Sequence, residues 1–354
     1  MKKAVTAFCV GAAVLLSGCF GGREISKRSF VQIIGIEKDK EIYNVSLQLF
    51  RSESSDGTPD VTKANAEAVT GRGSTVSEAM SEAALKTGKE LFTGHTKLVV
   101  FGDGLNDPSD ELEYLYSEKL SPSCPVVYSR EPSEITDTFS EEGIFSAERI
   151  INVMEGYVRN GGAVYTSAAE VSEAARVTEA AYPLPVVFSD GKEVYFSGAA
   201  VGDSDGIHGT LSEDSVYGAV ILADSFPKDG RINISADVGG IPVSAEIVSA
   251  CCTRKAFNDG GRLAVNAEIK LKLKIKDNGH GVDEKRIGSE VCAKVKDAVI
   301  NAFSTAVWYN GCDIFEIGKA VQRDCPELYA AEEWDSGEIL RDSMLNVKVY
   351  GESV

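Results

Sequence analysis

The strongest constraint on the fold is a long segment in which apolar and polar residues alternate. From Arg262 to Lys276 every second residue is apolar, and the residues between them are mostly polar or charged, with lysines at 270, 272 and 274. Because successive side chains of a strand point to opposite faces of its sheet, this pattern predicts an antiparallel strand with one buried and one solvated face. From Asp283 to Val307 apolar residues recur at helical spacing, which predicts an amphipathic helix. Gly311 should end that helix, and we expect a shorter helix at Cys312–Val321 and a closing strand at Ser343–Tyr350.

The first half of the chain predicts alternating strands and helices, in the order β-β-α-β-α-β-α. Polar residues 51–67 are expected to form a loop or an insertion at a sheet edge. The predicted strands are Ser29–Glu37, Ile42–Phe50, Lys97–Gly102 and Pro125–Arg130, and the predicted helices are Ser74–Leu91, Asp110–Lys119 and Phe145–Arg159.

The N-terminus has the pattern of a bacterial lipoprotein signal. Two lysines precede the apolar run Ala4–Leu16, which is too short to cross a bilayer as a helix. In such signals the cysteine thiol is joined to diacylglycerol and the chain is cut just before it, so Cys19 is the predicted lipidation site. The alternative is an ordinary secretory signal with a cysteine near its end. The lipobox residues before this cysteine are Leu16, Ser17 and Gly18.

Length and these patterns together predict the domain organisation. A chain of 354 residues is too long for one core of ordinary size. The predicted fold class is α+β or mixed α/β, in consecutive domains whose mixed or antiparallel sheets are packed by helices. The predicted segments are a signal peptide at 1–18, a lipidated tether at 19–28, a mixed α/β region of one or two subdomains at 29–190 and an α+β domain at 191–354.

The charge balance bears on partners and location. The chain carries a net charge of −18 with 25% charged and 43% hydrophobic residues, which excludes a disordered or polytopic membrane protein. No nucleic-acid partner is expected, because phosphate neutralisation needs a basic face. Anionic lipid headgroups would repel so acidic a surface. The lipid on Cys19 should therefore hold the protein to the membrane, outside the cytoplasm.

The cysteines and histidines indicate no metal or cofactor site. Adjacent Cys251 and Cys252 should point to opposite faces of a strand. The six thiols are interpreted mainly as small buried apolar groups, and one disulfide among the last five is left open. With three histidines and no C-x-x-C pair, no zinc spacing is present. The six cysteines after the tether are Cys124, Cys251, Cys252, Cys292, Cys312 and Cys325.

No catalytic motif is complete, so no catalytic residue is predicted. Gly71-Arg72-Gly73 resembles the start of a dinucleotide fingerprint, but its third glycine is missing, and a turn before a helix is expected. Asp203-Ser204-Asp205-Gly206 lacks the later acidic ligands of a calcium loop and is interpreted as a solvated turn. His95 is interpreted as a structural histidine at the entrance to a strand.

Several short blocks, in order along the chain, resemble the Ger(x)C family of spore germination lipoproteins. Each block is short, and their order and spacing carry the resemblance. They are Arg23-Glu24-Ile25, Ile34-Gly35-Ile36-Glu37-Lys38-Asp39, Gly94-His95-Thr96-Lys97, Phe196-Ser197-Gly198-Ala199-Ala200-Val201, and Asp313-Ile314-Phe315 with Gly318, Pro326 and Trp334.

This resemblance implies a non-enzymatic, lipid-anchored C subunit of a nutrient germinant receptor. Such a subunit works beside the integral membrane subunits A and B at the outer face of the spore inner membrane, and the family offers no catalytic residues to carry over. A solute-binding lipoprotein serving a transporter is the alternative. That alternative predicts two similar doubly wound domains, which the long alternating strand argues against. An extracytoplasmic enzyme with an unfamiliar carboxylate site is the third hypothesis.

Overall fold

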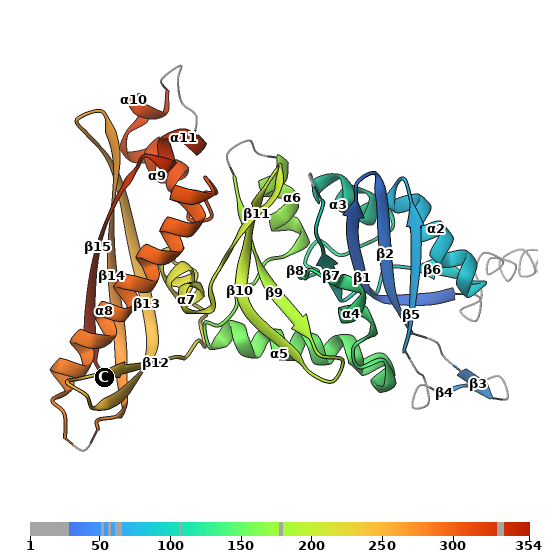
Figure 1. Cartoon of the computed structure of the whole chain (residues 1–354), viewed down its shortest axis with the longest axis horizontal. Coiled ribbons are helices and arrows are strands. Elements are labelled where there is room, and N and C mark those ends of the chain that lie inside the picture. Colours follow the sequence, from blue (N-terminus) through green and yellow to red (C-terminus); the bar gives the residue numbers. More distant parts are fainter. Residues whose placement is uncertain are drawn as a thin grey trace, which may run out of the picture.

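The computed structural model describes residues 28–50, 53–55, 58–60, 66–105, 108–176, 180–279, 281–330 and 336–354. Its strands form a nine-stranded sheet, a four-stranded sheet and a small two-stranded hairpin. Figure 1 shows three parts side by side: an N-terminal part, a middle part and a C-terminal part. This agrees with the predicted fold class of mixed and antiparallel sheets packed by helices.

The N-terminal part is a mixed sheet built around β1. This strand pairs with β2 in antiparallel fashion and with β7 in parallel fashion, and β7 continues in parallel to β8. Its strands are β1 (Arg28–Asp39), β2 (Ile42–Phe50), β5 (Ala66–Gly73), β6 (Glu90–Phe92), β7 (Leu98–Phe101) and β8 (Val126–Tyr128).

The middle part extends the same sheet through an antiparallel group of strands. β9 (Tyr182–Ser189) pairs with β10 (Val194–Asp203), which pairs with β11 (Gly206–Leu211). A single residue pair, Tyr128 with Val186, joins β9 to β8. Residue 190, the predicted boundary between the two halves, therefore lies in the turn between two paired strands of one sheet. That boundary stays a prediction.

Both faces of the nine-stranded sheet are buried at its centre, in β7 and β8. Val99 and Phe101 belong to one apolar cluster, whereas their neighbours Leu98 and Val100 belong to another on the opposite face. A parallel strand covered on both sides needs apolar residues at every position, which explains the unbroken run in β7. The helices of these two parts are α2 (Val76–Thr87), α3 (Pro108–Ser117), α4 (Pro132–Asp137), η4 (Ser140–Phe145), α5 (Ser146–Arg159) and α6 (Ala168–Arg176).

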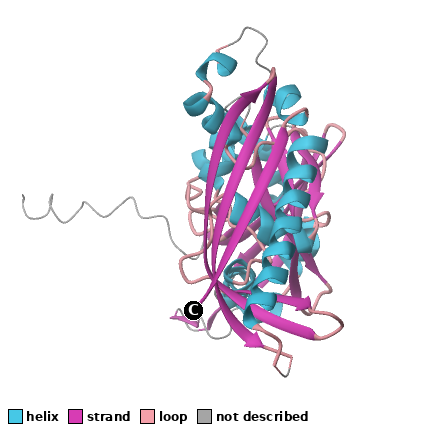
Figure 2. Ribbon diagram, turned by 90° about the vertical axis from the view of Figure 1, so that its left-hand side faces the viewer, coloured by secondary structure: helices cyan, strands magenta, loops and turns pink. Residues whose placement is uncertain are grey.

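The C-terminal part is a sheet in the order β12-β13-β14-β15, and α8 packs against it. β14 alternates between buried and exposed residues along most of its length, which confirms the predicted one-sided strand. In Figure 2 these long strands lie toward the viewer. The elements are α7 (Glu213–Leu222), β12 (Ile232–Asp237), β13 (Pro242–Asp259), β14 (Arg262–Asp277), α8 (Glu284–Phe303), η5 (Ser304–Tyr309), α9 (Ile317–Asp324), α10 (Pro326–Tyr329), α11 (Ser336–Arg341) and β15 (Met344–Ser353).

The expected turn at Gly71-Arg72-Gly73 is wrong, because these residues end β5. This strand pairs with β2, and α2 crosses directly above it. A Cβ atom on Gly71 would lie 2.0 Å from the carbonyl oxygen of Ala79, so only glycine permits this close approach. The segment predicted as a loop also contains a small hairpin, β3 (Glu53–Ser55) with β4 (Thr58–Asp60).

The predicted helices differ in their bounds from those of the structure, and for two of them particular residues explain the difference. The first ends at Thr87, because Gly88 adopts the left-handed conformation (φ 65°) and caps the helix, and β6 follows. The short helix expected from Cys312 begins at Ile317 instead. The residues before it form a loop whose geometry depends on Asp313.

Candidate functional site

The predicted anchor lies outside the described residues. Cys19 and its lipobox precede the first described residue, Arg28, and Trp334 also lies outside the described ranges. Within the described ranges, no helix combines the length and apolar character needed to cross a membrane. The sites that can be built from the structure lie where the middle and C-terminal parts meet.

Asp313 organises the loop before α9. Its buried carboxylate accepts hydrogen bonds from the backbone N–H groups of Phe315, Ile317 and Gly318, at 3.2, 2.9 and 2.7 Å. The N–H groups of Ile317 and Gly318 belong to the first turn of α9, so the carboxylate satisfies donors that a helix N-terminus leaves unpaired. Burial raises the pKa of Asp313, and the three hydrogen bonds oppose that rise.

Phe315 fixes the same loop to the core of the C-terminal part. Its fully buried ring stacks on Phe303, with ring centroids 5.8 Å apart. The Arg254 guanidinium donates a hydrogen bond to the Phe315 carbonyl oxygen. The Asp313-Ile314-Phe315 block thus has a structural reason for its residue types: a buried cap, an apolar neighbour and a core aromatic ring.

This loop also lines a cavity of about 650 Å³ between the middle and C-terminal parts. The volume lies within the range of small-ligand sites. Most ionic groups around it are already paired: Glu170 accepts hydrogen bonds from Ser167, and Lys319 forms an ion pair with Glu316 at 2.6 Å. The lining includes Tyr165, Tyr182, Ala219, Phe315, Lys319 and Tyr329.

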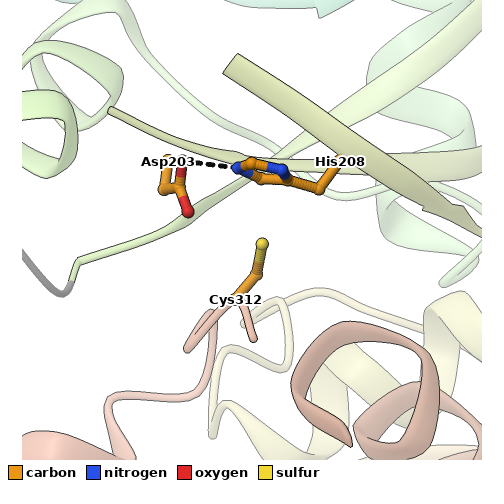
Figure 3. Close-up of side chains that lie close together, drawn as sticks. All are labelled: Asp203, His208 and Cys312. Atoms are coloured by element: carbon orange, nitrogen blue, oxygen red, sulfur yellow. Dashed lines mark hydrogen bonds and ion pairs between the residues drawn. The ribbon is translucent and has the colours of Figure 1, made fainter. Parts of the chain in front are cut away.

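A second group lies nearby, where the β10–β11 hairpin meets the loop after η5. One potential ligand atom from each of Asp203, His208 and Cys312 lies within 4.8 Å of the others. Figure 3 shows the Cys312 thiol pointing toward the paired Asp203 and His208 side chains. His208 Nε2 lies 2.6 Å from Asp203 Oδ1, and the backbone N–H of Asp205 donates to the same oxygen at 2.8 Å. The motif interpreted as a solvated turn supplies this aspartate at the β10–β11 turn.

The chemistry of this group differs from that of a cysteine nucleophile. Such a nucleophile needs an accessible thiol with a lowered pKa. Cys312 is only 1% exposed, and burial, reinforced by Asp203, raises the pKa of its thiol to about 12. Sequence spacing gave no sign of this group, because Cys312 is brought to the hairpin only by tertiary folding.

The remaining cysteines mostly agree with their interpretation. Cys124, Cys252 and Cys325 are buried, Cys292 is half-buried, and none of the described cysteines forms a disulfide. Cys251 is exposed, so its interpretation as a buried group is wrong: Cys252 occupies the buried face of β13 and its neighbour points outward, as expected for adjacent residues of a strand.

His95 has the structural role expected of it. It lies just before β7, and its ring contacts the rings of Phe30 and Phe92, with centroids 5.9 and 5.4 Å away. His280 lies outside the described residues.

Comparisons with known proteins identify the family. Residues 21–186 match the family described as spore germination protein N-terminal domain, and residues 197–352 match spore germination B3/GerAC-like, C-terminal. This chain belongs to the Ger(x)C family of spore germination proteins.

A solved member of the Ger(x)C family has the same fold. The crystal structure of the GerBC protein aligns with 91% of this chain and 96% of its own length, with a TM-score of 0.60 at 14% identity. No curated protein sequence matches this chain significantly.

Proposed function

We propose that this Ger(x)C protein is the lipid-anchored C subunit of a spore nutrient germinant receptor and that it acts without catalysis. It would contact the integral membrane subunits A and B at the outer face of the spore inner membrane. The observation that carries the proposal is the pair of family matches, which together span residues 21–186 and 197–352 in the order the family requires.

The N-terminal sequence supports the anchoring step. Diacylglycerol on Cys19 would supply two acyl chains, and each buried methylene contributes about 0.8 kcal/mol of membrane affinity. The nine residues from Cys19 to the start of β1 at Arg28 span at most about 30 Å. Lipidation would therefore keep the folded parts close to the bilayer, where contacts with membrane subunits gain from a high effective concentration.

Co-purification tests the proposed partners. The chain would carry a C-terminal tag, and inner membranes from dormant spores would be extracted with mild detergent. Recovery of two multi-spanning proteins with the chain is the expected result. Recovery from vegetative membranes together with an ABC permease, or recovery of the chain alone, would contradict the proposal.

Two cysteine substitutions test the anchor. Cys19→Ala should leave unprocessed precursor without lipid label, because the acceptor thiol is gone. Cys9→Ala is the matched control: this cysteine lies in the apolar run of the signal, so the variant should be cleaved and labelled normally. Cleavage and lipid labelling of the Cys19→Ala chain would show that the lipobox interpretation is wrong.

The cavity of about 650 Å³ favours one alternative, a solute-binding lipoprotein. A solute that binds only the folded chain raises its thermal midpoint, and the rise grows with the logarithm of solute concentration above Kd. We expect no such rise when the chain is screened with amino acids, sugars and nucleosides. A concentration-dependent rise with one of these solutes, abolished by Tyr165→Ala in the cavity wall, would favour solute capture.

A further inference from the structure

We propose that Asp203, His208 and Cys312 form a binding site for one divalent zinc ion at the junction of the middle and C-terminal parts. The site goes beyond the proposed receptor function and does not depend on it. The donor atoms are one carboxylate oxygen, one imidazole nitrogen and one thiolate sulfur. This combination suits zinc and similar transition metals, whereas calcium and magnesium prefer oxygen ligands alone.

The distances between the donor atoms allow coordination after a small adjustment. Zinc bonds of about 2.0–2.3 Å in a tetrahedron place neighbouring ligand atoms about 3.3–3.8 Å apart. The three donor atoms here lie within 4.8 Å of one another. The hydrogen-bonded pair Asp203 Oδ1 and His208 Nε2, at 2.6 Å, must open by about 0.7 Å, and separations as long as 4.8 Å must shorten by about an ångström. Side-chain rotation can supply both changes, because the Cys312 thiol already points toward the other two side chains (Figure 3).

The surroundings hold the Asp203 ligand in place. The N–H of Asp205 donates to the Asp203 carboxylate at 2.8 Å, and the Tyr182 hydroxyl donates to the Asp203 backbone carbonyl at 3.3 Å. Hydrogen bonds of this kind orient metal ligands and are worth roughly 10–100-fold in affinity. The Asp203 and His208 side chains remain 29% and 31% exposed, so water can reach the fourth coordination position.

Binding needs a simple proton balance. The Cys312 thiol must lose its proton to solvent to become the ligand thiolate. His208 Nε2 now faces the Asp203 carboxylate, so its proton moves to Nδ1 when Nε2 binds the ion. No oxidant, reductant or further reactant is required.

The ion would connect two parts of the molecule. Asp203 and His208 belong to the β10–β11 hairpin, whereas Cys312 belongs to the C-terminal part, next to the Asp313 loop that lines the cavity. A bound ion would thus fix the hairpin to that loop. Zinc should raise the thermal midpoint of the chain, because it binds only when both parts are correctly docked.

Cobalt substitution tests the site directly. The mature chain, purified in detergent through a tag without histidine, would be stripped with a chelator and titrated with Co²⁺. One equivalent should produce a near-ultraviolet thiolate-to-cobalt band. Cys312→Ala should abolish the band, and His208→Gln, a substitution at a partly exposed position, should weaken Co²⁺ binding at least about tenfold. Cys325→Ala removes a buried thiol outside the site and should leave the band unchanged.

Zinc provides the second readout. We expect one equivalent of Zn²⁺ per chain by elemental analysis and a rise in thermal midpoint that is lost in His208→Gln and kept in Cys325→Ala. Absence of the cobalt band in the unmodified chain, or its persistence in Cys312→Ala, would overturn the proposal. Equal thermal stabilisation of all variants would also overturn it, because the ion would then bind elsewhere.

Discussion

The two sheets of this protein bury their residues in different ways. In the nine-stranded sheet, neighbouring residues of β7 belong to different apolar clusters on opposite faces. In the four-stranded sheet, β14 buries one row of side chains and exposes a row of lysines on the other face. Figure 1 shows helices around the first sheet, whereas the second sheet forms one end of the molecule. The first sheet serves as an internal scaffold, and the second leaves a broad face free for contacts.

Alanine substitutions in the two sheets should produce the largest changes in stability. Leu98→Ala and Phe101→Ala, on opposite faces of β7, should each lower the free energy of unfolding by about 2–5 kcal/mol. In β14, Leu271→Ala should cost a similar amount, but its neighbour Lys272→Ala should change stability by less than about 0.5 kcal/mol. Denaturant unfolding measures each value. A large cost for Lys272→Ala would show that the second sheet is covered on both faces.

Helix packing also differs between the two regions. In the C-terminal part, a Cβ atom on Gly218 of α7 would lie 2.4 Å from the Ala298 backbone in α8. Gly218→Ala should therefore cost about 1–3 kcal/mol through overpacking. A Cβ atom on Gly156 of α5 would have no other atom within 4 Å, so Gly156→Ala should stabilise the fold by about 0.5–1 kcal/mol. Equal effects in thermal unfolding would contradict the close helix crossing.

In each region a buried polar side chain organises its surroundings. Gln48 donates to the Thr136 and Thr138 carbonyls and accepts from Ser146, whereas Asp313 caps α9. Gln48→Ala and Asp313→Asn should each cost about 1–2 kcal/mol. The two costs should differ in their dependence on pH, which denaturant unfolding at several pH values would reveal.

The pH dependence follows from the direction of the shift. Burial raises the pKa of Asp313 in the folded chain above the ordinary pKa of an aspartate. The carboxyl group therefore contributes fully to the free energy of unfolding below that ordinary pKa, and this contribution decreases as pH rises through the raised pKa of the folded state. The cost of Asp313→Asn should therefore shrink as pH rises, while that of Gln48→Ala stays constant. An Asp313→Asn cost that grows with pH would contradict this account.

The smallest predicted effect concerns two surface carboxylates. Hydrogen bonds from the backbone of Glu193 and Lys192 hold the pKa of Asp190 at about 2, and Arg323 does the same for Asp324. Both carboxylates should stabilise the fold above their ordinary pKa, and the contribution should disappear as pH falls to about 2. Asp190→Asn and Asp324→Asn should each show a small loss at neutral pH. High salt should reduce only the loss at Asp324, whose partner is an ion.

The sequence predicted those strands whose residues follow a simple rule of burial. β14 alternates and β7 is continuously apolar, so both were recognised. β9 contains Pro183 and Pro185, and β11 is short and glycine-rich, so neither carries a clear strand pattern. Their positions depend on pairing with neighbouring strands, which local sequence does not encode.

The candidate sites were less predictable than the fold. The Asp313 block was recognised through family resemblance, but its role as a buried cap follows only from the hydrogen bonds. Asp203 and His208 are close in sequence, whereas Cys312 joins them from a distant loop. A three-residue site assembled from two parts of a fold leaves no spacing for a motif search to detect.

The central claim is that this chain is a receptor subunit that acts through contacts with membrane proteins. Chemical crosslinking within the native membrane tests it most directly. Inner membranes from dormant spores would be treated with an amine-reactive crosslinker, for which the exposed lysines of β14 are suitable targets. The account predicts crosslinks from this chain to two multi-spanning membrane proteins. Crosslinks confined to copies of the chain itself, or directed to a transporter permease, would contradict it.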